Sequence, residues 1–199
     1  MIVSCICVTQ PGRERFLEEA ISCFDSQDYP AGERELVIVR DAKDGTTLGE
    51  LRNAGIAIAS GKYIMTWDDD DLYSPTRISQ QVMMLEQDGA DVCFLRRITM
   101  RCSCGAEFDS HDRKGGWECT MLARRDKILE YPAIGAFEDK IMIDAMLHKG
   151  ARRVTLHGSS SRVYVKRYHG ENTIDLDGHR MIFRKAGHDC REMQGVATA

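Results

Sequence analysis

Four consecutive carboxylates, Asp68-Asp69-Asp70-Asp71, follow the apolar run 63–66, which predicts a buried strand. Ligands of open α/β sheets bind outside the carboxyl ends of strands, so this position favours a binding site. Carboxylates crowded into one pocket repel each other, and a divalent cation such as Mg²⁺ or Mn²⁺ is their natural counter-ion. The run therefore predicts a metal site that carries phosphate. The alternative is a solvated acidic turn that caps the helix expected near Pro75.

The segments around this run alternate between short apolar and amphipathic stretches, which is typical of βαβ units. We therefore expect an α/β fold, a single domain with a mostly parallel central sheet flanked by helices. Residues 96–118 carry no clear period. The expected strands are 2–8, 36–39, 63–66, 92–95, 119–123, 154–156 and 163–165. The expected helices are one between Pro11-Gly12 and Tyr29-Pro30, then 48–59, 75–87 and 139–147.

Composition and charge exclude several classes of protein. A chain of 199 residues with 43% hydrophobic content can bury one core but is short for two domains. Apolar periodicity fades after residue 184, so we expect a domain over 1–184 and a partly disordered tail over 185–199. A net charge of -4 gives no footprint for a nucleic-acid polymer. Without a signal-peptide pattern or a transmembrane segment of roughly 20 apolar residues, the expected location is cytoplasmic.

The chain has eight cysteines, which we expect to be reduced thiols because no signal peptide precedes them. Cys102 and Cys104 flank one serine, and His111 and Cys119 follow nearby, a set that is compatible with half of a zinc site. The spacing is not Cys-x-x-Cys and no second pair is evident. A turn with free thiols is therefore the alternative.

Several segments, taken in order, resemble glycosyltransferase family 2, whose members have the GT-A fold and move a sugar from a nucleotide diphosphate. One such segment alone is weak, and the Asp-x-Asp pattern occurs in many unrelated proteins, but the order over most of the chain is specific. The segments are Val3 to Thr9, Gln27-Asp28-Tyr29-Pro30, Glu35 to Asp41, Leu51-Arg52-Asn53-Ala54-Gly55-Ile56 with Ser60 to Ile64, Asp68 to Leu72 with Pro75 and Arg77, Phe137-Glu138-Asp139, and Tyr168 to Thr173.

The resemblance implies a metal and a general base. Asp70 would hold Mn²⁺ or Mg²⁺, with His169 as a further ligand, and Asp68 would orient the ribose or a metal-bound water. Asp139 would take the proton from the acceptor hydroxyl, and Glu138 would orient the acceptor. The alternative for Glu138 and Asp139 is a helix cap favoured by the helix dipole, and a lone histidine is commonly structural.

The resemblance also implies substrate-binding residues. Asp41 and Thr9 would lie at the nucleotide base, and Arg52 would reach the base or a phosphate. Trp117 would stack on a sugar of the acceptor, with core packing as its alternative. Asp69 belongs with these residues, although we expect at least one of Asp69 and Asp71 to cap the following turn.

The expected function is a metal-dependent, inverting transfer from a nucleotide-diphospho-sugar, with a UDP-sugar as the implied donor and a glycan, protein or lipid-linked acceptor. Gln10-Pro11 stands where the family commonly has Tyr-Asn, and Arg40 stands where it has a second acid, which leaves recognition of the base open. A non-catalytic nucleotide-sugar-binding module of the same fold is one alternative. A sugar nucleotidyltransferase is the other, but residues 9–13 are a poor version of the glycine-rich phosphate loop that such an enzyme uses.

Overall fold

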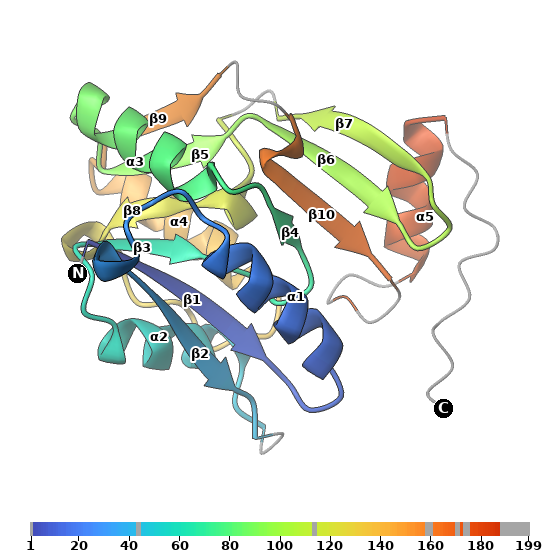
Figure 1. Ribbon diagram of the computed structural model, residues 1–199, viewed down its shortest axis with the longest axis horizontal. Helices are drawn as coiled ribbons and strands as arrows, with labels where there is room; N and C mark the ends of the chain where they lie inside the picture. Colours follow the sequence, from blue (N-terminus) through green and yellow to red (C-terminus); the bar gives the residue numbers. More distant parts are fainter. Residues whose placement is uncertain are drawn as a thin grey trace.

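A six-stranded sheet forms the centre of the structure, a computed structural model that describes residues 2–42, 45–112, 115–157, 161–169, 172 and 176–187 (Figure 1). The strand order is β2-β1-β3-β8-β5-β9, and β8 alone runs against the other five. The predicted α/β fold with a mostly parallel sheet is therefore confirmed. The strands are β1 (Val3–Thr9), β2 (Arg34–Arg40), β3 (Tyr63–Thr66), β5 (Val92–Leu95), β8 (Leu122–Arg124) and β9 (Arg153–Leu156).

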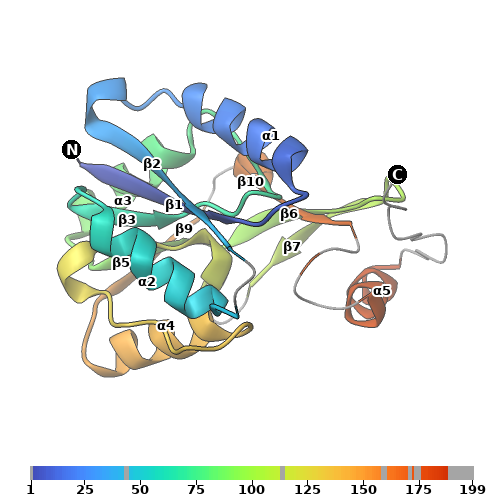
Figure 2. The same ribbon diagram turned by 90° about the horizontal axis from the view of Figure 1, so that it is seen from below.

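Helices cover both faces of this sheet, because successive side chains of a buried strand point to opposite faces and both sets are apolar here. Cys5 and Cys7 of β1 pack in one core with α1 (Glu14–Asp25) and α3 (Arg77–Asp88). Ile6, between them, packs on the other face under α2 (Leu48–Ile58). Figure 2 shows α2 and α4 (Glu138–His148) together on that second face, with α1 on the opposite one.

A second, four-stranded sheet stands beside the first, in the order β4-β10-β6-β7. Helix α5 (Leu176–Lys185) packs against it through Phe183, whose side chain is fully buried between the rings of Phe108 and Tyr168 at centroid distances of 5.1 and 5.4 Å. The strands are β4 (Leu72–Tyr73), β6 (Arg97–Cys102), β7 (Glu107–His111) and β10 (Tyr164–Tyr168).

Several predicted elements need correction. The strand expected over 119–123 begins only at Leu122, because a 3-10 turn at Glu118–Thr120 precedes it. The hydroxyl of Thr120 closes that turn by donating to the carbonyl of Trp117 at 2.6 Å. The helix expected from Pro75 begins at Arg77, and the strand expected over 163–165 runs from Tyr164 to Tyr168.

The segment 96–118, which showed no period, contains β6 and β7, and α5 ends at Lys185. Within the predicted tail, 188–199 lies outside the described residues. The described residues form no group of three or more His, Cys, Asp or Glu side chains that could hold a metal ion, so the zinc alternative has no support from that part of the chain. None of the helices in the described ranges is long and apolar enough to cross a membrane.

Close packing of α2 on the sheet explains the glycine of the Arg-Asn-Ala-Gly segment. A Cβ atom at Gly55 would lie 2.7 Å from Cγ2 of Ile6 and 3.0 Å from Cγ2 of Val39, both on β-branched side chains that cannot easily move. Gly55 is therefore the position at which the helix approaches β1 and β2.

We expect Gly55→Ala to lower the free energy of unfolding by about 1–2 kcal/mol, because the overpacking cost exceeds the gain in helix propensity. Urea unfolding measures this. Gly32→Ala, where an added Cβ meets nothing within 4 Å, is the matched control and should leave the midpoint unchanged. An equal effect of both substitutions would contradict the packing explanation.

Candidate active site

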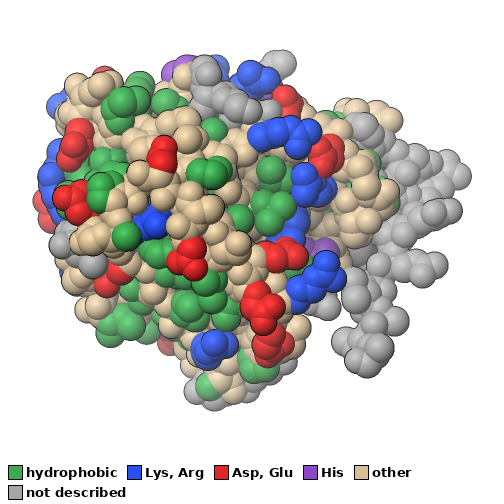
Figure 3. Space-filling model, in the orientation of Figure 1, with side chains coloured by type: hydrophobic (Ala, Val, Ile, Leu, Met, Phe, Trp, Pro, Cys, Tyr) green, Lys and Arg blue, Asp and Glu red, His purple; other side chains and the backbone are tan. Residues whose placement is uncertain are grey.

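A pocket of about 1470 Å³ opens at the carboxyl ends of β1, β2 and β3, between the two sheets. Its walls come from the acidic loop after β3, the start of α4, and β6, β7, β10 and α5. Near the middle of the face shown in Figure 3, acidic and basic side chains lie next to one another instead of forming a patch of one sign. The predicted site residues that line the pocket are Thr9, Asp41, Arg52, Asp68, Asp69, Asp70, Trp117, Glu138 and Asp139.

The acidic loop is held at both ends. At its start, the indole of Trp67 is fully buried and donates to the carbonyl of Ala20 in α1 at 3.2 Å. At its end, Asp71 is also fully buried and accepts from the hydroxyl of Tyr164 and from the backbone N–H of Arg167, both in β10. Asp71 therefore fastens the loop to the second sheet, which leaves Asp68, Asp69 and Asp70 at the pocket.

Asp70 is the most heavily bonded of these carboxylates. Its Oδ2 accepts from Nη2 of Arg13, from Nε2 of His169 at 3.2 Å and from Nδ2 of Asn172 at 3.2 Å. Burial favours the neutral acid, but the hydrogen bond from His169 and the charges of Lys166 and Arg13 outweigh it, so the pKa of Asp70 is well below its ordinary value. Asp70 is therefore an ionised carboxylate in a site that excludes most solvent.

The pKa of Asp69 is shifted in the opposite direction to that of Asp70. Its Oδ1 lies 3.1 Å from Nη1 of Arg13, and its side chain is buried. Burial raises the pKa of Asp69 to about 6, although Thr9 and Arg13 oppose this shift. Arg13 thus bridges two neighbouring carboxylates with opposite pKa shifts.

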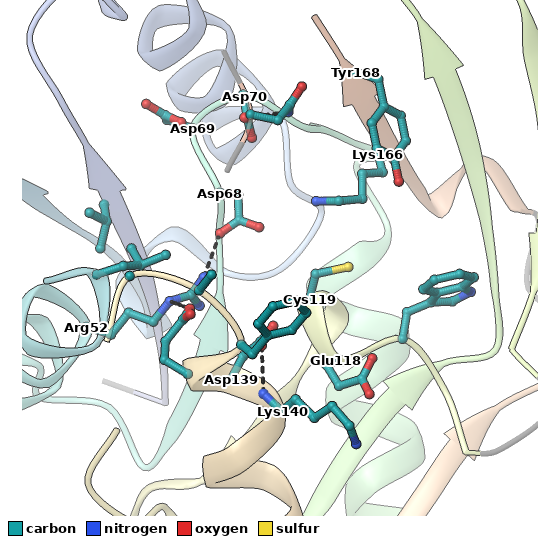
Figure 4. A pocket seen from close by; sticks show the side chains of 18 of the residues that line it. Arg52, Asp68, Asp69, Asp70, Glu118, Cys119, Asp139, Lys140, Lys166 and Tyr168 are labelled. Carbon is teal, nitrogen blue, oxygen red and sulfur yellow. Dashed lines mark hydrogen bonds and ion pairs between the residues drawn. The ribbon is translucent and has the colours of Figure 1, made fainter. Parts of the chain in front are cut away.

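Arg52 connects the acidic loop to α4. Its Nη2 lies 3.3 Å from Oδ1 of Asp68 (Figure 4). Its Nε lies 3.1 Å from Oε1 of Glu138. The neighbouring Asn53 exchanges two hydrogen bonds of 2.9 Å with the backbone of Tyr131, which fixes the segment leading to α4. The Arg-Asn-Ala-Gly segment therefore positions the acidic loop, α4 and the sheet relative to one another.

The start of α4 brings two carboxylates to the pocket in different settings. Glu138 is 3% exposed and faces Arg52, and burial raises its pKa despite that partner. Asp139 is half-buried at the pocket wall, where its Oδ1 accepts from the backbone N–H of Lys140 at 2.6 Å. Phe137 precedes them with φ of 64° and a 68% exposed side chain, so the backbone is strained at the pocket edge.

The opposite wall carries Lys166, which the sequence did not single out, together with Cys119 and Trp117. Lys166 of β10 enters the pocket with its nitrogen directed toward Asp68 in Figure 4, and it lies 3.3 Å from Oδ2 of Asp71. Cys119 lines the same region, and burial raises the pKa of its thiol to about 12. Trp117 is half-buried, and its buried indole N–H has no hydrogen-bond partner among the described residues. A substrate oxygen is a fitting acceptor for that N–H.

The remaining predicted residues fall as follows. The backbone N–H of Asp41 donates to the carbonyl of Thr9 at 2.8 Å, so both lie at the ends of adjacent strands as expected. His169 is 7% exposed and bonds Asp70 without being part of the pocket wall. Of the closing segment after Tyr168, Gly170, Glu171 and Thr173 lie outside the described residues.

The sequence did not predict Arg13 or Asn172 as site residues. Arg13 follows Gly12 at the end of the first turn, and Asn172 lies inside the closing segment that carried part of the family resemblance. Position in that segment was thus the only signal for Asn172. Arg13 had a weaker one, as a basic residue just after the first strand.

Two side-chain atoms at the acidic loop have a suitable spacing for binding a small divalent cation. Oδ2 of Asp70 and Nε2 of His169 lie 3.2 Å apart, close to the ~3 Å between neighbouring ligands of an octahedral ion whose bonds are about 2.1 Å. Among the described residues there is no group of three or more His, Cys, Asp or Glu side chains that could hold a metal ion. Magnesium sites of phosphate-transfer enzymes commonly use one or two carboxylates and complete the shell with substrate phosphate and water. A two-residue set therefore fits a cation that binds together with a diphosphate.

The charge balance agrees with this fit. Ion pairs at the loop connect five carboxylates with three basic side chains, which leaves two carboxylates in excess before His169 is considered. One divalent cation balances that excess. The five acids are Asp68, Asp69, Asp70, Asp71 and Glu138, and the three bases are Arg13, Arg52 and Lys166.

Comparison with known proteins supports the resemblance that the sequence showed. Residues 26–118 match the model of "Glycosyl transferase family 2". A comparison with curated proteins finds no match. Among solved structures, S. aureus TarS 1-349 is similar with a TM-score of 0.70 and 17% sequence identity, over 84% of this chain and 60% of that one.

Two further structures show the same fold. TarS 1-349 in complex with UDP-GlcNAc has a TM-score of 0.69 and 16% identity, over 93% of this chain and 65% of that one. The mannosyltransferase PcManGT from Pyrobaculum calidifontis, in complex with GDP-Man and Mn²⁺, has a TM-score of 0.66 and 16% identity, over 94% and 61%. The chain thus spans less than two thirds of the length of these proteins. The chain thus has the GT-A fold of these structures, and its residues 26–118 match the model of glycosyl transferase family 2.

Proposed function

We propose that the protein is a metal-dependent, inverting glycosyltransferase that moves a sugar from a nucleoside diphosphate donor to a hydroxyl acceptor. One observation carries the proposal. Asp68, Asp70 and Asp139 line one pocket at the carboxyl ends of the parallel strands, and Arg52 connects the first of them to the start of α4. The carboxylates proposed to act at the diphosphate and the carboxylate proposed as the general base therefore lie in the same pocket.

The proposed donor is a nucleotide-diphospho-sugar, with a UDP-sugar as the first candidate. Support comes from similar structures, of which TarS is in complex with UDP and with UDP-GlcNAc, and PcManGT with GDP-Man. Thr9 and Asp41 are the proposed contacts to the nucleotide base, because they end the two adjacent strands at the pocket. Asp69, buried against Arg13, helps to hold the diphosphate end of the site.

Asp70 and His169 are the proposed ligands of Mn²⁺ or Mg²⁺, and Asp68 orients the ribose from beside them. When bound, the cation supplies Lewis-acid stabilisation of the leaving diphosphate. Arg52 and Lys166 are the basic side chains that neutralise further charge as the diphosphate leaves, because both line the pocket close to Asp68.

Asp139 is the proposed general base. The acceptor oxygen forms a bond to the anomeric carbon while the bond from that carbon to the diphosphate oxygen breaks. The electron pair leaves with the nucleoside diphosphate, and the acceptor proton passes to the carboxylate of Asp139. A single displacement of this kind inverts the anomeric configuration. Glu138 holds Arg52 in place, since it is buried against that guanidinium, and Trp117 provides the aromatic surface for the acceptor, which is a glycan, a protein or a lipid-linked sugar.

We expect Asp70→Ala to abolish the part of donor binding that depends on metal. The measurement is the melting temperature of the protein with UDP-, GDP-, CDP- and dTDP-sugars, each with Mn²⁺ and with EDTA. A donor at 100 times its Kd adds about 2.7 kcal/mol to the free energy of unfolding, which gives a clear rise for the unmodified chain. The exposed Asp28→Ala should keep that rise. If Asp70→Ala binds the donor equally well with and without Mn²⁺, the metal-site proposal is wrong.

A further inference from the structure

Arg13 is a basic side chain directed into the acidic site from the turn that precedes α1. Its guanidinium lies 3.1 Å from Oδ1 of Asp69 through Nη1 and contacts Oδ2 of Asp70 through Nη2, while its side chain is 13% exposed. The guanidinium also lies 5.6 Å from the centre of the Phe16 ring. Arg13 thus bridges the two carboxylates without acting as a side-chain cap of its own helix.

Oδ2 of Asp70 accepts more hydrogen bonds than a carboxylate oxygen normally does. It accepts from Arg13, His169 and Asn172, whereas a carboxylate oxygen has about two lone-pair positions. A cation that takes both Asp70 and His169 as ligands has to approach this same oxygen. At least one of the present donors must then give way.

Of the three donors, Arg13 has the greatest electrostatic conflict with a cation. The amide of Asn172 is uncharged, and a neutral imidazole of His169 is itself a metal ligand. The guanidinium of an arginine stays positively charged near neutral pH, and it repels a second cation at short range. Asp69 gives Arg13 a second carboxylate to hold after it releases Asp70.

We propose that Arg13 is a built-in competitor of the divalent cation at Asp70. Arg13 holds the carboxylate of Asp70 when no cation is bound, and it gives up Oδ2 of Asp70 while keeping Asp69 when a cation binds. This inference rests on the proposed metal site. A residue that only orients a metal ligand supports metal binding, so its removal weakens binding. The proposal predicts the opposite for Arg13, whose removal should strengthen metal binding.

The test is the affinity for Mn²⁺ alone, measured by electron paramagnetic resonance on the full chain after treatment with EDTA and without any donor. Arg13→Gln removes the competing charge and is expected to bind Mn²⁺ about tenfold more tightly or better. Arg13→Lys keeps the positive charge but loses the contact through two nitrogens. Its Mn²⁺ affinity is therefore expected to lie between those of the original protein and Arg13→Gln. Unchanged or weaker Mn²⁺ binding by Arg13→Gln would overturn the proposal.

Two controls separate this proposal from its premise. Arg15→Gln removes the same charge two residues away, at a side chain that is 89% exposed and pairs with Glu19, and should change the affinity less than about twofold. Asp70→Ala should lose Mn²⁺ binding in both the original and the Arg13→Gln background. If Asp70→Ala still binds Mn²⁺, the metal-site proposal fails, and with it the inference; if only the gain at Arg13→Gln is missing, the metal site stands and the competition fails.

Thermal unfolding gives a second readout that does not depend on resonance signals. Without metal, Arg13→Gln leaves two buried carboxylates with fewer partners, so its melting temperature should fall in EDTA. Addition of Mn²⁺ should then raise the melting temperature of Arg13→Gln by more than that of the original protein. An equal or smaller rise in Arg13→Gln contradicts the competition.

Discussion

Asp139→Asn is expected to slow the release of nucleoside diphosphate by about 10²- to 10⁴-fold while donor binding stays unchanged. Asparagine has nearly the same shape as aspartate but cannot take a proton. The rate is measured with the best donor from the binding panel and with water as the acceptor, since water must lose a proton as any hydroxyl does. Binding of the same donor is measured by the rise in melting temperature.

Asp144→Asn is the matched control for this experiment. Asp144 lies on the same helix, its side chain is 61% exposed, and it forms an ion pair with Lys140 at 2.8 Å. The same chemical change there should leave the rate within about twofold, because a surface ion pair contributes little. If Asp139→Asn keeps the full rate of donor cleavage, Asp139 is not the base.

The choice of Asp139 over Glu138 as the base follows from their surroundings. Glu138 is 3% exposed and lies 3.1 Å from Nε of Arg52, so its carboxylate is committed to a buried ion pair. Asp139 is half-buried at the wall of the pocket, and it has no ion pair with Arg52. Both residues begin α4 and could cap it. Their surroundings differ, however, so Glu138 is the positioning residue and Asp139 is the candidate for proton transfer.

The elements with a buried apolar face were predictable from the sequence. Strands β1, β3 and β5 are surrounded by helices on both faces, so they are short continuous apolar runs that any period analysis detects. Strand β7 was not predictable, because Asp109 and His111 are exposed and the strand forms one edge of the small sheet. Strand β4 has only two residues, Leu72–Tyr73, and is defined by its partner β10 instead of by its own sequence.

The candidate site was predictable where it depends on local segments. The acidic run, Arg52 and Asp139 each belong to a short motif, and their order in the chain indicated that they meet. Arg13 and Lys166 approach the acidic loop from turns and strands far away in sequence, and their positions depend on how β1 and β10 dock. Such contacts follow from tertiary packing, which the local pattern does not encode.

Arg77→Ala is expected to lower the free energy of unfolding by about 3–5 kcal/mol, which is the largest effect on stability that we anticipate. The side chain of Arg77 is fully buried, and its guanidinium lies 5.1, 4.4 and 4.9 Å from the centres of the rings of Trp67, Tyr73 and Tyr164. It also donates to the carbonyl of Thr66 at 2.7 Å, directly before the acidic loop. A desolvated cation–π contact is worth about 2 kcal/mol or more, and truncation adds a cavity.

Urea unfolding of Arg77→Ala, Arg77→Met and Lys62→Ala separates these contributions. Methionine fills much of the same space without the charge, so Arg77→Met should lose less stability than Arg77→Ala, and the difference between them reports the cavity. Lys62, which is 55% exposed and lies 4.7 Å from the centre of the Tyr63 ring, is the matched exposed cation–π pair. Its removal should cost under about 1 kcal/mol. A loss below about 1.5 kcal/mol for Arg77→Ala would mean that the three rings close around the space by themselves, in which case Arg77 is not what fixes the start of the acidic loop.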